Sequence, residues 1–341
     1  MNVFHRAAAI LAACFLVASA ATAGTISGAG ASFPYPVYAK WASGFQAKTG
    51  NNLNYQSIGS GGGIAQIKAG TVTFGASDMP LLPADLGKSN LVQFPTVIGG
   101  IVPVINLAGV GNNRLVLNGA VLADIFAGNI SRWDDQRIAA LNRGMKLPHQ
   151  AIAVVHRSDG SGTTFVFTSF LAQKSKFWHD EIGASTAVEW PVGLGAKGNE
   201  GIASYVSKTA GSIGYVEFAY AEQNKLNCVR LYNRAGKAVT ASAATFKSAA
   251  SGADWAKAST KQFYVLLVDQ PGDASWPITA TTYILMNRRP RDAGASSLAL
   301  QFFRWSYANG DEMAAALGYV PLPDNAVTAI EASWKQIAGV K

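Results

Sequence analysis

Helix and strand patterns alternate along the whole chain, and this alternation limits the fold more than any other feature. Residues 36–48 carry aromatic side chains on one helical face, namely Tyr38, Trp41 and Phe45. Gly50 marks the end of that helix. The following stretch LNYQSI has the pattern of a strand, SGGGIAQIKAG that of a short helix, and TVTFGAS that of a second strand. This order predicts an α/β fold with largely parallel strand pairing.

The N-terminal sequence MNVFHRAAAILAACFLVASAATAG has the pattern of a signal peptide. One arginine precedes an apolar stretch, and small residues in an A-x-A arrangement end at Ala23. We therefore expect residues 1–23 to direct export to the periplasm. The tetrapeptide LAAC also resembles a lipoprotein cleavage box, but cleavage before Cys14 would leave very little hydrophobic core. Once Cys14 is removed, Cys228 is the only cysteine and no intramolecular disulfide can form.

The length of the chain and two interrupted strand patterns predict two lobes. Without residues 1–23 the chain has 318 residues (341 minus 23), more than one core usually holds. In VIGGIVPVINLAG, residues 97–109, we expect the paired glycines and Pro103 to interrupt a long strand, and a loop at residues 269–275 separates two further strand runs. If the chain crosses between two domains at both places, the two connections would suit a hinged cleft. The expected first lobe comprises residues 24–104 and 276–341, and the expected second lobe comprises residues 105–275.

The positive charge of the chain is dispersed. The formal net charge of +8 falls to +7 (8 minus 1) when Arg6 leaves with the signal peptide, and charged residues make up only 14% of the chain. The densest cluster, NRRPR at residues 287–291, is typical of a solvated turn. We therefore do not expect nucleic acid as a partner.

Four short segments combine glycines with hydroxyl side chains: GAGASFP (28–34), SIGSGGGI (57–64), FGASDMP (74–80) and HRSDGSGTT (156–164). Three of them directly precede a predicted helix. The unpaired N–H groups and partial positive charge of a helix N-terminus can hold an oxyanion. Ser60 or Ser161 alone would be explained by ordinary N-capping. Several glycines in succession are costly unless the backbone must approach something closely, so the recurrence favours binding.

Motifs for catalysis are weak or incomplete. No serine has glycine both two residues before and two residues after it, so the nucleophile-elbow pattern is absent. The three histidines of the mature chain, His149, His156 and His179, show neither metal-ligand spacing nor the pattern of a triad. GLGAKG at residues 193–198 matches a dinucleotide fingerprint but does not follow a clear buried strand. GTVTFGAS has the spacing of a P-loop, with alanine where the phosphate-binding lysine would stand.

The glycine-rich segments belong to a longer series: GAGASFPYPVYAKW, SIGSGGGI, FGASD, FPTVIGG, RSDGSGT, FVFTSF, GLGAKGNEGI, IGYVEFAYA and WPIT. On these segments the chain resembles, through nearly its whole mature length, the phosphate-binding proteins of bacterial phosphate-specific ABC transporters. The resemblance implies the two-lobed periplasmic-binding-protein fold of type II, with two hinge crossovers and phosphate held in the cleft. It also implies a binding protein without catalysis or cofactor.

The resemblance further implies a set of phosphate ligands: Ser32, Phe33 through its backbone N–H, Ser60, Asp78, Arg157, Ser161, Gly162 and Thr163. We expect Asp159 to orient the guanidinium of Arg157 rather than to contact the ligand, and its replacement by Asn to weaken binding moderately. The chain departs from the commonest family pattern at three positions. Ser32 replaces a frequent threonine, Gly61 a frequent second serine, and His156 a frequent arginine.

Asp78 is unusual because a carboxylate beside an anion should repel it. The contact becomes favourable when the anion carries a proton, as HPO4 and H2PO4 do and sulfate does not. An unmatched pair of buried acceptors costs roughly 1 to 3 kcal/mol, and more when charged. Asp78 can therefore disfavour sulfate, although capping of the following turn before Met79 is the simpler structural explanation for this residue.

The expected partners are inorganic phosphate and the membrane-embedded subunits of an ABC permease with their ATPase, and we expect a monomer. Three alternatives remain at this point. The first is an exported phosphatase with Ser161 or Ser60 as nucleophile, although no base or metal set is evident. The second is a receptor for another oxyanion such as sulfate or molybdate, which Asp78 disfavours. The third is a surface-interaction role for a phosphate-binding fold.

Overall fold

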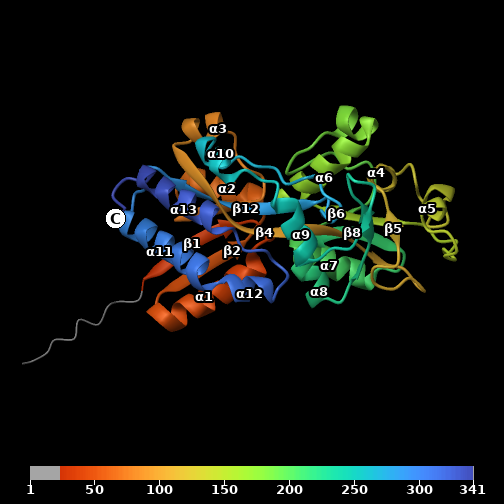
Figure 1. Ribbon diagram of the computed structural model, residues 1–341, viewed down its shortest axis with the longest axis horizontal. Helices are drawn as coiled ribbons and strands as arrows, with labels where there is room; N and C mark the ends of the chain where they lie inside the picture. Colours follow the sequence, from red (N-terminus) through yellow and green to blue (C-terminus); the bar gives the residue numbers. More distant parts are fainter. Residues whose placement is uncertain (1–23, 341) are drawn as a thin grey trace, which may run out of the picture.

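The computed structural model describes residues 24–340 and consists of two α/β lobes arranged side by side along one continuous sheet (Figure 1). The expected signal peptide, including Cys14, lies outside the described residues. Within residues 24–340, no helix combines the length and apolar character that crossing a membrane requires. The expected α/β class and two-lobed arrangement are confirmed.

A nine-stranded sheet in the order β2-β1-β3-β12-β4-β8-β6-β7, with β9 added beside β4, runs through both lobes. A second sheet of three short strands, in the order β11-β10-β5, lies in the second lobe (Figure 1). The strands are β1 (Thr25–Gly30), β2 (Asn52–Ser57), β3 (Phe74–Ser77), β4 (Leu91–Asn106), β5 (Val116–Leu117), β6 (Ala153–Arg157), β7 (Leu194–Ala196), β8 (Ser212–Glu217), β9 (Asn227–Cys228), β10 (Arg230–Tyr232), β11 (Ala238–Val239) and β12 (Thr279–Asn287).

The strand pairing is parallel at the outer edges of the large sheet and antiparallel at its centre. β1 pairs in parallel with β2 and β3, and β6 with β7 and β8. β12 pairs antiparallel with β3 and β4, and β4 with β8. The expectation of largely parallel pairing is therefore wrong at the centre. The reason is that the chain returns to the first lobe through β12, which runs back along β4.

β4 is a single uninterrupted strand of 16 residues, so the expected interruption at the paired glycines and Pro103 is wrong. The strand pairs with β12 up to Gly100 and with β8 from Ile101 onward, and thus belongs to both lobes. The two glycines make room for aromatic rings instead of ending the strand. A Cβ added at Gly100 would lie 2.0 Å from the Phe246 ring, and one added at Gly99 would lie 2.8 Å from the Phe33 ring.

The helices pack on both faces of the sheet in each lobe (Figure 1). Those of the first lobe are α1 (Tyr35–Thr49), α2 (Ser60–Ala69), α3 (Pro83–Lys88), α11 (Ala293–Asn309), α12 (Asp311–Ala315), α13 (Asp324–Ser333) and the 3-10 turn η2 (Trp334–Gln336). Those of the second lobe are α4 (Gly119–Phe126), α5 (Gln136–Leu141), α6 (Gly162–Lys174), the π-helical turn η1 (Trp178–Ile182), α7 (Gly198–Lys208), α8 (Phe218–Gln223) and α9 (Ala243–Ala250).

One segment of the expected second lobe packs on the first lobe instead. Helix α10 (Trp255–Thr260) lies against α13, next to α3 in Figure 1. The chain beyond it is held there by two side chains of the first lobe. Gln93 Nε2 donates to the Gln262 carbonyl at 2.9 Å, and the Tyr283 hydroxyl donates to the Val265 carbonyl at 2.5 Å. The expected boundary at residue 275 therefore misplaces this segment.

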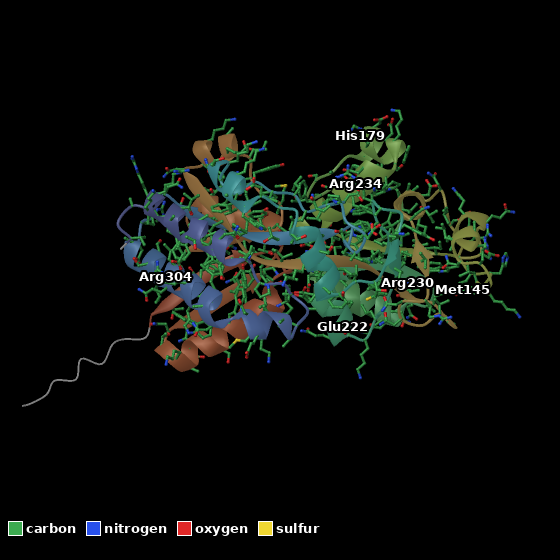
Figure 2. All side chains as sticks on the ribbon, in the orientation of Figure 1. Met145, His179, Glu222, Arg230, Arg234 and Arg304 are labelled. Carbon is green, nitrogen blue, oxygen red and sulfur yellow. The ribbon has the colours of Figure 1, made fainter. Side chains whose placement is uncertain are left out.

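The charged side chains spread over the outside of both lobes (Figure 2). Arg304 on the first lobe is an example, and the polar side chain of His179 on the second lobe is similarly placed, with 54% and 71% of the two side chains exposed. Each pairs with a carboxylate of its own lobe, Glu331 and Asp180 respectively. These exposed pairs contribute little to stability. The surroundings of the buried charges are very different, as the site between the lobes shows.

Candidate functional site

The glycine-rich turns of the two lobes meet at backbone distance. The N–H of Gly61, at the start of α2, donates to the carbonyl of Gly160 at 2.8 Å. Gly59 has a φ of +84°, and a Cβ there would lie 2.3 Å from Asp159 Oδ2. A Cβ at Gly61 would lie 3.1 Å from Gly160 Cα. The successive glycines therefore allow close approach of two backbones, and Gly61, where the family often has serine, is part of that contact.

Ser60 lies at the centre of this contact. Its side-chain oxygen accepts hydrogen bonds from the backbone N–H of Asp78 at 3.2 Å and from that of Gly162 at 3.0 Å. Both lone-pair positions of the hydroxyl are thus used by the protein. Its proton is left to donate to a further acceptor. The N–H of Gly162, which the resemblance implied as a phosphate ligand, is engaged with Ser60 in this structure.

The hydroxyls of Ser32 and Thr163 share one donor, the amide side chain of Asn199. Ser32 Oγ accepts from the backbone N–H and from Nδ2 of Asn199, at 3.1 and 2.9 Å. Thr163 Oγ1 accepts from the same Nδ2 at 3.4 Å. Ser161 caps α6, and its Oγ accepts from the Thr164 N–H at 3.0 Å. Like Ser60, these hydroxyls accept from protein donors and keep their own protons to donate.

Phe33 contributes backbone and packing rather than a polar side chain. Its ring is fully buried and meets the ring of Tyr319 edge to face at 6.2 Å. The Tyr319 hydroxyl donates to the Phe33 carbonyl at 2.6 Å, and the Tyr220 hydroxyl donates to the neighbouring Ser32 carbonyl at 2.7 Å. The turn that carries Ser32 and Phe33 is therefore held by side chains from later parts of the chain.

Arg157 and Asp159 form a buried ion pair in the turn before α6. Nε and Nη2 of Arg157 donate to Oδ1 and Oδ2 of Asp159, at 2.7 and 2.5 Å. Burial raises the pKa of Asp159, but the hydrogen bonds and charge of Arg157 outweigh burial and leave this pKa below its usual value. The third nitrogen, Nη1, is buried and has no partner among residues 24–340. Asp159 thus holds two of the three guanidinium nitrogens of Arg157, and the third remains without a partner in the described part of the chain.

Asp78 follows β3 and is 2% exposed. Its Oδ1 accepts from the Thr282 hydroxyl at 2.6 Å, whereas Oδ2 is buried without a partner in the part of the chain that the structure describes. Burial raises the pKa of Asp78 to about 7, against the lowering effects of the Thr282 hydrogen bond and the charge of Arg157. Asp78 is therefore a buried acceptor close to a buried cation, and not the turn cap of the simpler explanation.

The structure gives no support to a nucleophile at Ser60 or Ser161. Among the described residues, the side-chain oxygens of these serines bond to backbone N–H groups and to neither histidine nor carboxylate. His156 stacks on the Trp190 ring, with centroids 4.7 Å apart and an interplanar angle of 12°. Burial lowers the pKa of His156. Its packing on Trp190 makes it part of the hydrophobic wall of the second lobe.

The sequence analysis did not single out several residues that hold the site. Asn199 orients two hydroxyls, Thr282 bonds to Asp78, and the Tyr215 hydroxyl bonds to both the Arg157 N–H and Thr164 Oγ1, at 3.2 and 2.6 Å. A weak signal existed for Asn199, which directly follows the glycine-containing segment GLGAKG at the start of a helix. Nothing in the sequence indicates that Thr282 or Tyr215 lies beside the site.

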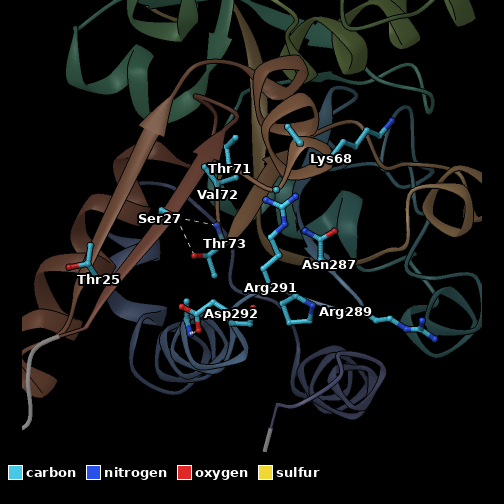
Figure 3. Close-up of a pocket in the computed structure, with 15 residues that line it drawn as sticks. Thr25, Ser27, Lys68, Thr71, Val72, Thr73, Asn287, Arg289, Arg291 and Asp292 are labelled. Carbon is cyan, nitrogen blue, oxygen red and sulfur yellow. Dashed lines mark hydrogen bonds between the residues drawn. The ribbon is translucent and has the colours of Figure 1, made fainter.

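A separate surface hollow of about 430 Å³ lies on the first lobe, away from these residues (Figure 3). Lys68, Arg289 and Arg291 line it, together with Asp292, which caps α11. At its edge Ser27 bonds to the hydroxyl and the N–H of Thr73, both at 3.1 Å. None of the residues expected to bind phosphate lies there, and the hollow contains no buried ion pair.

Comparison with known proteins agrees with this geometry. Residues 17–309 match the family model described as a PBP superfamily domain. Phosphate-binding protein PstS of Xylella fastidiosa is 53% identical over 91% of this chain and 84% of its own length. That of Pasteurella multocida is 51% identical over 91% of this chain and 90% of its own length.

The chain belongs to the PstS family of phosphate-binding proteins. The same fold occurs in a solved structure, a high-affinity periplasmic phosphate-binding protein (PfluDING) bound with phosphate. It matches with a TM-score of 0.73 and 23% identity, over 91% of this chain and 93% of that one. At 23% identity this comparison shows a common fold and nothing further.

Proposed function

We propose that this protein binds inorganic phosphate between its two lobes and delivers it to an ABC-type phosphate permease. Two buried atoms, Arg157 Nη1 and Asp78 Oδ2, have no hydrogen-bond partner among residues 24–340. Their position beside hydroxyls whose protons remain to be donated is the observation that carries the proposal. The PstS relatives support it by their name and their high identity over most of the chain. The protein is a binding protein and not an enzyme.

A buried phosphate needs a partner for each oxygen, because lost hydration without replacement costs several kcal/mol per group. We propose that Arg157 Nη1 donates the one charged hydrogen bond. The four hydroxyls of Ser32, Ser60, Ser161 and Thr163 and the N–H groups of Phe33 and Thr163 would add neutral donors. Gly162 would act mainly by holding Ser60, to which its N–H already donates.

Asp78 would distinguish phosphate from fully ionised oxyanions. A protonated phosphate oxygen can donate to Oδ2, whereas sulfate would place a second acceptor against it. Thr282 holds Oδ1 at 2.6 Å, so the carboxyl cannot easily turn away. The raised pKa, about 7, supports a role in which this group and the ligand share one proton.

Release would follow from separation of the lobes. The contacts Gly61–Gly160 and Ser60–Gly162 join the two lobes directly, so opening breaks them and exposes the ligand to water. We propose that the lobes comprise residues 24–104 with 276–341, and 105–275, apart from the segment around α10 that packs on the first lobe. The partner would be a membrane permease with its ATPase, reached by a monomer exported to the periplasm through residues 1–23.

Calorimetric titration of the mature chain tests the proposal, after unfolding and refolding have removed carried-over ligand. We expect tight binding of phosphate and arsenate with one site per chain, and much weaker binding of sulfate. Equal binding of sulfate, or no heat with phosphate, would contradict the proposal. A phosphomonoester assay on the same sample addresses the phosphatase alternative, for which we expect no turnover.

A further inference from the structure

Asn199 is fully buried at the start of α7, and every polar atom of its side chain is engaged. Its Oδ1 accepts from the backbone N–H of Glu217 at 2.9 Å. Its Nδ2 donates to Ser32 Oγ at 2.9 Å and to Thr163 Oγ1 at 3.4 Å. Because the Glu217 N–H can only donate, the amide has one orientation that satisfies all three contacts.

This orientation determines what the two hydroxyls can do. A hydroxyl oxygen that accepts from an N–H group directs its own proton elsewhere. Ser32 and Thr163 therefore present protons, rather than lone pairs, to an anion between the lobes. Ser60 and Ser161 reach the same state through backbone N–H groups, which substitutions other than proline leave in place. Ser32 and Thr163 differ from them, because both accept from the Asn199 side chain, and Ser32 accepts from the Asn199 backbone N–H as well.

Asn199 also joins the two lobes at this point. Ser32 belongs to the first lobe, between β1 and α1, whereas Asn199 and Thr163 belong to the second. The preceding residue, Gly198, donates its N–H to Asp159 Oδ1 at 3.1 Å. The beginning of α7 therefore contacts both the hydroxyl donors and the carboxylate that orients Arg157.

We propose that Asn199 is a positioning residue for the bound anion. It orients the hydroxyls of Ser32 and Thr163 as donors, and it does so for Ser32 only when the lobes are closed. The inference rests on the proposed phosphate function. Asn199 contributes to phosphate affinity without contacting the ligand directly. Asn199 thereby couples closure of the lobes to completion of the donor set.

Two substitutions test this role with different chemistry. Asn199→Ala removes Nδ2, and we expect phosphate affinity to fall about tenfold, as for loss of one to two hydrogen bonds near a charge. Asn199→Asp keeps the acceptor for Glu217 but turns an oxygen toward both hydroxyls, which would then donate to the aspartate. We expect the Asp variant to lose at least 100-fold in affinity, with faster phosphate release in stopped-flow measurements.

A double-mutant cycle with Ser32→Ala separates positioning from general packing. If Asn199 acts through the Ser32 hydroxyl, Asn199→Ala costs clearly less affinity in the Ser32→Ala background than in the parent protein. Additive losses would overturn the proposal, and so would an unchanged affinity in both Asn199 variants. Should Asn199→Ala fail to fold, the Asp variant is carried through the same cycle.

Asn142 provides the matched control. It is also a buried asparagine, and its side chain holds the backbone N–H and carbonyl of Val116, both at 2.8 Å. We expect Asn142→Ala to lower the melting temperature without changing phosphate affinity. If the parent protein bound no phosphate, the proposed function itself would be wrong. If the parent protein bound phosphate and both Asn199 variants bound it equally well, only the inference about Asn199 would be wrong.

Discussion

Each lobe contributes one buried aspartate to the site, and the surroundings of the two carboxyls shift their pKa values in opposite directions. On the second lobe, Asp159 is paired with the guanidinium of Arg157 and has a pKa below its usual value. On the first lobe, Asp78 meets a neutral hydroxyl from Thr282, and burial raises its pKa to about 7. The difference shows that residue type alone does not define a role here: one carboxyl orients a cation, and the other accepts a hydrogen bond from a neutral hydroxyl.

From this contrast we expect the two lobes to contribute differently to affinity and to selectivity. The second lobe holds a permanent charge in a fixed geometry, which attracts any small oxyanion. The first lobe adds hydroxyl donors and a lone carboxyl, which only a protonated oxyanion satisfies. Affinity should therefore depend most on Arg157 and selectivity most on Asp78. Four measurements, from the largest expected effect to the smallest, would sharpen or break this comparison.

Arg157→Met should weaken phosphate binding on the order of 1000-fold, because it removes the charged donor of the proposed set and leaves the Asp159 carboxylate without a cationic partner. Calorimetric titration would measure the loss. The double variant with Asp159→Asn separates the two causes, since it leaves no unpaired carboxylate. Arg304→Met on the surface is the control and should leave affinity unchanged. If the Arg157→Met variant kept full affinity, the charge on the second lobe would not contribute to phosphate binding.

Asp78 should make the unliganded protein less stable as pH rises. Between about pH 4 and 7 the folded state keeps a proton on Asp78 that the unfolded state has released, so the free energy of unfolding falls across this window. Asp78→Asn removes this contribution. Its stability relative to the parent should therefore be higher at pH 8 than at pH 5, by about 3 kcal/mol.

Urea titrations at the two pH values would measure this difference. Glu217, a second buried carboxyl with a raised pKa, is present in both proteins. Burial is the main cause of its shift and the charge of Asp78 a smaller one, so most of its contribution cancels in the comparison. A stability difference that is the same at both pH values would show that Asp78 is ionised in the unliganded fold already at pH 5.

Asp78→Asn should also reduce the preference for phosphate over sulfate, by up to about 100-fold. An amide can turn its NH2 group toward a sulfate oxygen, so the repulsion between two acceptors disappears, a change of about 1 to 3 kcal/mol. The ratio of the two dissociation constants at pH 8 is the quantity to measure. An unaltered ratio would take the selective role away from Asp78.

Asp159→Asn should change phosphate affinity least, by no more than about threefold. The sequence alone predicted a moderate loss from disorder of Arg157. In the structure, Arg157 has only 1% of its side chain exposed, and an asparagine oxygen can still accept from Nε. Loss of one hydrogen bond is offset by loss of a negative charge beside the anion. A loss as large as that of Arg157→Met would show that the ion pair acts as one unit.

The sequence predicted the fold class and singled out the glycine-rich turns that meet between the lobes, because glycines and hydroxyls before helices form a local pattern. It could not predict that β4 continues through its paired glycines, since the rings of Phe33 and Phe246 that fill the space come from distant parts of the chain. The packing of α10 on the first lobe was missed for the same reason. Local patterns carry no information about which distant surface a short helix will contact.

The sequence by itself determined the chemistry available at the site: one arginine, two aspartates and several hydroxyls in turns that can approach an anion. The tertiary structure decided how each group is used. Asn199 turns the hydroxyls of Ser32 and Thr163 into donors, Thr282 holds Asp78, and burial shifts the pKa of Asp78. These properties depend on desolvation and on partners 36 to 204 residues away in the sequence, so they arise only in the folded chain.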